Sequence, residues 1–228
     1  MFESNTISSF AKWYGASSSA CSWALDDARL GNGRAAIAPA SDQSLALATS
    51  LQLRSGASRV IVFAAAEAHN SVVSLVAGLG HALVELGAGE VLMLDSSERP
   101  AGGSPSGQSG IDQVVSGELP LDGLLEEVLP GLYVLSADGR ASNSFRMSGE
   151  SAKAFFKELR QRFRYVLVAA PPYAKDSEAR LLAKHSDGIV LTLQQGQQGR
   201  TRLLQIQREL KADRLVSLGF VLAGGSAK

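Results

Sequence analysis

The sequence has one cysteine and three histidines, which narrows the chemistry open to it. Cys21 has no second cysteine with which to form an internal disulfide. His69, His81 and His185 lie far apart in the sequence, so together with a single cysteine they do not make a metal site of familiar spacing. We therefore expect no structural metal, and the scarcity of cysteine favours a reducing compartment.

Long apolar runs and a charge excess of either sign are also missing. No run reaches the ~18 residues that cross a bilayer, and the start at residues 1–5 lacks the basic region and apolar core of a signal peptide. Lys+Arg and Asp+Glu number 22 each, so no overall field favours nucleic acid or an anionic membrane, and no local basic patch is evident. We expect a cytoplasmic protein with no nucleic-acid partner, which reaches a membrane only through another protein and does not insert into it.

The remaining composition is that of an ordinary folded chain. Its 228 residues, 45% hydrophobic, are enough for one sizeable α/β core. Residues 1–40 are rich in Ser, Ala and Gly and show no sustained period, which predicts an irregular extension. Trp13, Tyr14 and Trp23 in this extension either contact a partner, as interface aromatics do, or fold back on the domain. Residues 41–228 are predicted to form a single domain.

Strand and helix patterns alternate through that domain. Strands are predicted over 60–65, 91–95, 132–136, 165–170, 188–193 and 216–222, and helices over 42–54, 71–86, 121–129, 149–163, 178–184 and 201–210. The strands are almost continuously apolar, which is typical of a mostly parallel sheet covered on both faces. The fold class is therefore α/β and doubly wound, with any ligand expected at the carboxyl ends of the strands. The Gly- and Ser-rich connection 96–110 is predicted to be either functional or disordered.

The turn between the first predicted strand and the next helix has little of what a nucleotide site requires. A phosphate-binding loop needs glycines, a lysine for the anion and a Ser or Thr for magnesium. Residues 64–73 read AAAEAHNSVV and contain neither glycine nor lysine. His69, Asn70 and Ser71 either form a new polar site there or cap the helix. The sequence thus predicts the scaffold of a nucleotide-binding protein without its site.

Three later segments are similar to those of a known family. FRYVLVAAPP at 163–172, DSEARLLA at 176–183 and SDGIVL at 186–191 follow one another at the family's spacing. With the strand order, they make residues 41–224 resemble the cytoplasmic domain of bacterial tyrosine kinases, the capsule and exopolysaccharide branch of the deviant P-loop ATPases. The resemblance implies a P-loop NTPase fold.

The departures from this family fall on its catalytic positions. Val72 and Val73 stand where the resemblance places the lysine and the hydroxyl of the phosphate loop. In the second motif Asp95 and Arg99 are kept, whereas Ser97 replaces an acid. Asp95 and Arg99 are thus predicted to be vestigial, although an Asp at a strand end also commonly caps the following loop.

The third motif and the oligomerisation helix are altered as well. Ala169 stands in place of the Asp that organises magnesium, and the arginines of the family's assembly helix are absent from residues 43–52. The chain ends LAGGSAK, without the tyrosine-rich tail of these kinases. The prediction is therefore a pseudoenzyme with no catalytic, cofactor-binding or metal-binding residues and no cofactor, and self-association is left open.

The resemblance implies a role in exopolysaccharide or capsule synthesis and export. Its first interpretation is a non-catalytic protein that docks on an inner-membrane polysaccharide co-polymerase. The alternative is an active ATP-dependent protein-tyrosine autokinase with an altered loop. A third, a partition-type protein that positions other complexes, is disfavoured by the missing nucleotide switch.

Overall fold

The computed structural model describes residues 41–53, 59–67, 71–96, 114–115, 120–136, 149–174, 177–194 and 200–223. The predicted extension 1–40, with Trp13, Tyr14 and Trp23, lies outside these ranges. Ser97 and Arg99 also lie outside them, as do His69, Asn70 and almost all of the connection 96–110.

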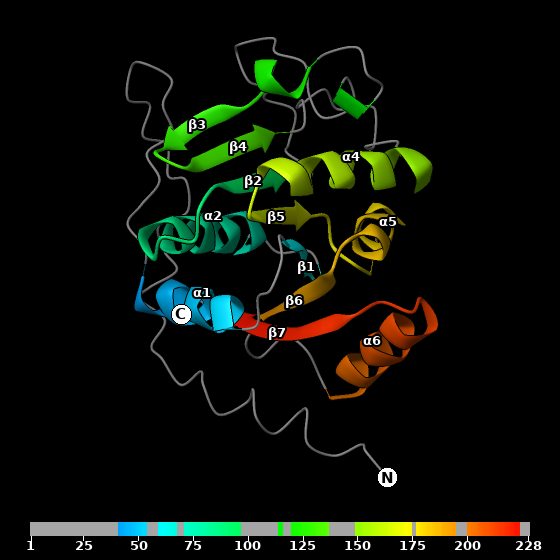
Figure 1. Ribbon diagram of the computed structural model, residues 1–228. Helices are drawn as coiled ribbons and strands as arrows, with labels where there is room; N and C mark the ends of the chain where they lie inside the picture. Colours follow the sequence, from blue (N-terminus) through cyan, green and yellow to red (C-terminus); the bar gives the residue numbers. More distant parts are fainter. Residues whose placement is uncertain are drawn as a thin grey trace, which may run out of the picture.

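Within the described residues, seven strands form one sheet in the order β3-β4-β2-β5-β1-β6-β7 (Figure 1). The strands are β1 (Arg59–Ala65), β2 (Val91–Asp95), β3 (Glu126–Leu129), β4 (Leu132–Ser136), β5 (Tyr165–Ala170), β6 (Gly188–Gln194) and β7 (Ser217–Ala223). Every neighbouring pair is parallel except β3 and β4. The predicted doubly wound, mostly parallel sheet is confirmed.

Helices cover both faces of this sheet, as Figure 1 shows. They are α1 (Asp42–Leu53), α2 (Ser71–Glu85), α4 (Gly149–Arg162), α5 (Ser177–His185) and α6 (Arg200–Ala212), with a short 3₁₀ turn, η1 (Leu121–Gly123). Helices α1 and α2 bury their apolar residues against one face, and α4, α5 and α6 against the other. None of the helices in the described ranges has both the length and the apolar character needed to cross a membrane.

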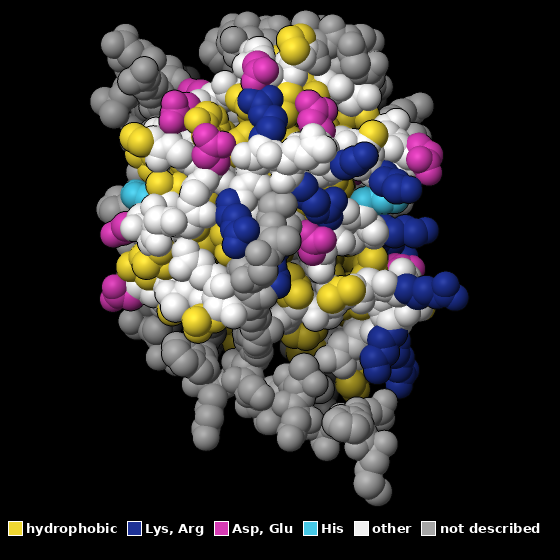
Figure 2. Space-filling view, viewed as in Figure 1, with side chains coloured by type: hydrophobic (Ala, Val, Ile, Leu, Met, Phe, Trp, Pro, Cys, Tyr) yellow, Lys and Arg dark blue, Asp and Glu magenta, His cyan; other side chains and the backbone are white. Residues whose placement is uncertain are grey.

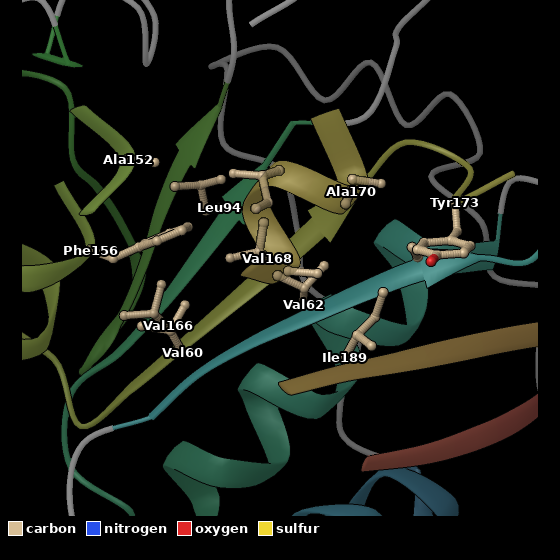
Figure 3. Close-up of a cluster of buried hydrophobic side chains, with 14 of the residues drawn as sticks. Val60, Val62, Leu94, Ala152, Phe156, Val166, Val168, Ala170, Tyr173 and Ile189 are labelled. Carbon is tan, nitrogen blue, oxygen red and sulfur yellow. The ribbon is translucent and has the colours of Figure 1, made fainter. Parts of the chain in front are cut away.

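The central strand β1 shows why the strands are apolar throughout. Val60 and Val62 belong to the hydrophobic cluster under α4 and α5 (Figure 3). Ile61 and Phe63 point the opposite way, into the cluster under α2. All four side chains are fully buried, since alternate residues of a strand face opposite sides of the sheet.

One predicted element was wrong. Residues 121–129, predicted as a helix, form η1 followed by the antiparallel edge strand β3. The leucine spacing is helical, but Gly131 adopts a positive φ of 84° and turns the chain into the β3–β4 hairpin. The Glu127 carboxylate accepts a hydrogen bond from the Gly131 N–H at 3.1 Å, which stabilises this turn.

Candidate functional site

Val72 lies near the carboxyl end of the sheet. It lies in the first turn of α2, directly after the connection that leaves β1. Its side chain is only 4% exposed and belongs to the same hydrophobic cluster as Phe63 and Ala169. Val73, the next residue, is partly buried against that cluster. The Val72 side chain therefore packs into the core and offers no charge to an anion.

Asp95 and Ala169 lie side by side at the ends of β2 and β5. The two residues are register partners in the parallel pairing of these strands, so their side chains point to the same face of the sheet. Asp95 is 3% exposed and Ala169 is fully buried. The odd-numbered neighbours on the same strands, Val91, Met93 and Leu167, lie in the cluster under α2. The structure therefore brings Val72, Asp95 and Ala169 to one region on the α2 side of the sheet.

Backbone hydrogen bonds continue past the strand ends at this edge. The Ala66 N–H donates to the Thr192 carbonyl at 3.0 Å, and the Tyr173 N–H donates to the Ala65 carbonyl at 2.9 Å. The Ser96 N–H and hydroxyl both donate to the Ala169 carbonyl, at 2.9 and 3.1 Å. These bonds satisfy groups that parallel strands otherwise leave at their ends. These hydrogen bonds thus tie the ends of β1, β2, β5 and β6 to one another.

A charged cluster lies beyond this edge, on the side of α5 and α6. Tyr173 is fully buried, and its hydroxyl donates to the Asp213 carboxylate at 2.9 Å. Arg180 stacks over the Tyr173 ring at 5.0 Å and lies 3.5 Å from Asp213 and 3.4 Å from Glu209. Burial, and next the hydrogen bond to Asp213, raise the pKa of the Tyr173 phenol, so it stays protonated. Figure 3 shows the Tyr173 ring beside Ile189, above β1.

The same cluster reaches the turn after β1. Arg202, near the start of α6, lies 3.4 Å from Glu67 and 3.7 Å from Glu209. Glu67 therefore joins the β1 turn to α6. No local sequence pattern indicates this cluster, because its members are separated by up to about 150 positions and share no motif.

The described residues include no group of three or more His, Cys, Asp or Glu side chains placed to hold a metal ion. Asp95 lies beside Ala169, the position where the resemblance expects the acid that organises magnesium. Its register partner Ala169 supplies no oxygen ligand, and Mg²⁺ is normally held through carboxylates and substrate phosphates.

Comparison with known proteins assigns the fold to a broad structural class. No family model matches the chain, and no curated protein matches it in sequence. Among solved structures, the MinD cell division protein of Aquifex aeolicus is similar, with a TM-score of 0.59, 18% identity, and 75% of this chain and 70% of that chain covered. The fold is that of the P-loop NTPases, as predicted.

Within that class, tyrosine kinase domains are more similar still. The kinase domain of the Escherichia coli tyrosine kinase Etk has a TM-score of 0.67 at 17% identity, over 79% of this chain and 74% of that one. The BceF tyrosine kinase domain has a TM-score of 0.63 at 21% identity, over 80% and 74%. This structural similarity confirms the predicted resemblance to bacterial tyrosine kinase domains at the level of the fold.

Proposed function

We propose that this protein is a non-catalytic relative of the bacterial tyrosine kinase domains and acts in exopolysaccharide or capsule synthesis and export. The observation that supports this most directly is the placement of Val72, Asp95 and Ala169 on the α2 side of the sheet. Val72 has no charge to neutralise a phosphate, and Ala169 has no oxygen for a metal ion. Val72 and Ala169 therefore do not supply the contacts that a magnesium nucleotide needs.

The expected loss of affinity is large. Charge-assisted contacts contribute about 1.5–3 kcal/mol each. Loss of the lysine contact and one metal-linked contact therefore costs roughly 3–6 kcal/mol, or about 10²–10⁴ in affinity. At the upper end of this range a micromolar site acquires a Kd of roughly 10 mM, and millimolar nucleotide leaves it mostly empty.

The proposed activity is docking rather than phosphoryl transfer. The partner would be the inner-membrane polysaccharide co-polymerase that the resemblance implies, and the protein would be cytoplasmic and peripheral to the membrane through that partner. Docking uses the outer surface of the domain and needs no phosphate. Trp13, Tyr14 and Trp23 are the proposed partner-binding residues, because aromatic side chains dominate interface energetics.

Nucleotide binding is the first test. Thermal unfolding with and without millimolar Mg-ATP, at matched ionic strength, should give the same melting temperature. A ligand at 100 times its Kd would add about 2.7 kcal/mol, which raises Tm by roughly 5–10 °C for a chain of this size. The Etk kinase domain serves as a positive control. A clear rise for this protein would favour the active autokinase instead.

The second test concerns the partner. The protein should co-purify with a polysaccharide co-polymerase from detergent extracts, and Trp13→Ala with Tyr14→Ala should weaken that association. Asp95→Ala is the matched control: if the variant folds, both the association and polysaccharide output should be unchanged. Loss of output in folded Asp95→Ala would show that the site retains chemistry.

A further inference from the structure

The chain has no net charge, but its acidic and basic residues are unevenly distributed along the sequence. Residues 41–148 contain 5 Lys/Arg and 12 Asp/Glu, a net charge of −7. Residues 149–228 contain 14 Lys/Arg and 7 Asp/Glu, a net charge of +7. The second of these segments includes the helices α4, α5 and α6.

That face is formed by α4, α5 and α6, which cover the same side of the sheet. The three helices contain ten Lys/Arg and four Asp/Glu. Figure 2 shows the Lys and Arg side chains running down the right-hand side of the molecule, over the helices that Figure 1 places there. The acidic strand β3 lies at the edge of the sheet farthest from β7, whereas Asp122 of the turn η1 forms an ion pair with Arg162 of α4.

Some of these cations are already neutralised within the fold. Arg160 lies 3.0 Å from Asp187, and Arg180 and Arg202 belong to the cluster with Glu209. Five others are solvent-exposed and form no ion pair within the described ranges. We call these five the basic face: Lys153 and Lys157 of α4, Lys184 of α5, and Arg208 and Lys211 of α6.

The helical spacing of the basic-face residues on α4 and α6 puts their side chains on the outer sides of these helices. Lys153 and Lys157 are four residues apart, and Arg208 and Lys211 are three apart, so each pair shares one side of its helix. The buried residues Phe155 of α4 and Ile206 of α6 occupy the opposite sides. The charges are therefore spread over three helices and do not converge on one point.

We propose that the basic face binds the surface of an anionic lipid bilayer. Four of its five members are lysines, which act as point charges and lack the planar fork with which arginine recognises individual phosphates. Spread charges suit headgroups that move laterally to meet them, and each basic residue near such a surface contributes to binding. Exposed Leu204, on the outer side of α6 with Arg208 and Lys211, adds an apolar contact.

Nucleic acid fits this face less well. Single strands bind through aromatic side chains on which bases stack, but Phe155 and Phe156 of α4 are buried and α5 and α6 contain no Phe, Tyr or Trp. Arginine, the residue that most often reads base edges in a duplex, contributes one of the five.

This inference goes beyond the proposed function, because docking on a protein partner does not require contact with lipid. The two therefore have separate tests: the partner test needs a co-polymerase, whereas the lipid test uses pure vesicles. Binding by the basic face would turn α1 and α2, which cover the opposite side of the sheet, away from the bilayer.

The experiment is co-sedimentation of the full chain with lipid vesicles. The protein should bind vesicles containing roughly one third phosphatidylglycerol, bind vesicles of phosphatidylcholine alone far less, and dissociate as salt shortens the Debye length from about 10 Å at 0.1 M. Lys153→Gln with Lys157→Gln should weaken binding about 30-fold, and Arg208→Gln with Lys211→Gln by a similar factor.

A charge-matched control separates the face from net charge. Thr49→Glu with Ser50→Glu, both exposed on α1, also lowers the net charge by two but should leave vesicle binding within about threefold, since α1 covers the opposite side of the sheet. Circular dichroism confirms that each variant is folded. The proposal is overturned if the protein does not bind anionic vesicles, or if it binds duplex DNA but not vesicles. It is also overturned if the α1 control variant weakens vesicle binding as much as the α4 variant with both lysines replaced.

Discussion

Substitution of Ala169 by aspartate tests whether residues 95 and 169 face each other at the carboxyl edge of the sheet. Ala169→Asp would place a second acid beside Asp95, its register partner on β2. Neighbouring strands are about 4.8 Å apart, so the two charges would lie roughly 5 Å apart. At an effective dielectric constant of about 20, their repulsion is about 3 kcal/mol. We expect Ala169→Asp to lower the free energy of unfolding at pH 7.5 by at least this amount.

Ala169→Asn separates charge from volume. Asparagine has almost the same shape as aspartate, so both variants overpack the buried site at a shared cost of about 1–3 kcal/mol. The additional loss in Ala169→Asp should then be about 3 kcal/mol and should largely disappear in the double variant Asp95→Asn/Ala169→Asp. Urea unfolding, analysed by linear extrapolation, measures all four proteins of the double-mutant cycle.

The pH dependence has a definite sign. Repulsion from Asp95 and burial raise the pKa of the new carboxyl above the unfolded value of about 3.9. The loss of folding stability caused by this carboxyl is therefore absent below about pH 4, and it grows as the pH rises toward the pKa of the carboxyl in the folded state. If Ala169→Asp is no less stable than Ala169→Asn, or if Asp95→Asn gives no relief, the two side chains do not face each other. Stabilisation of Ala169→Asp by Mg-ATP alone would instead indicate a latent metal site.

Two further predictions concern other contacts. Tyr173→Phe removes the hydrogen bond to Asp213 but keeps the buried ring, so the free energy of unfolding should fall by about 1–2 kcal/mol; an unchanged urea midpoint would contradict this. Gly188→Ala would place a methyl group 2.5 Å from Leu218 Cγ and should cost about 1–3 kcal/mol through overpacking. Gly123→Ala, where a Cβ meets nothing within 4 Å, should melt within about 1 °C of the wild-type protein.

Much of the fold could be predicted from local pattern. The continuous apolar runs of β1, β2 and β5 mark buried parallel strands, and the structure confirms them within one residue. Residues 121–129 could not be predicted this way, because their leucines fit a helix and only pairing with β4 makes β3 a strand. Tertiary context overrode the periodicity there.

The site depended on topology as well as on pattern. The substitutions at Val72 and Ala169 are visible in the sequence, but the adjacency of Asp95 and Ala169 requires β5 to lie next to β2, which no local signal specifies. The basic face was missed for the same reason: Lys157, Lys184 and Lys211 are far apart in sequence and come together only because their helices cover one side of the sheet.

The position of β1 at the centre of the sheet has a consequence for biosynthesis. Its partners, β5 and β6, begin 106 and 129 residues after Arg59. At roughly 5–20 residues per second, a ribosome needs about 5–20 s to make the segment from β1 to β5. During that time the apolar strand RVIVFAA has neither neighbour and resembles the segments that aggregate most readily. Folding of this chain should therefore be largely post-translational and sensitive to chaperone supply, and chains that stop before β6 should fail to fold at all.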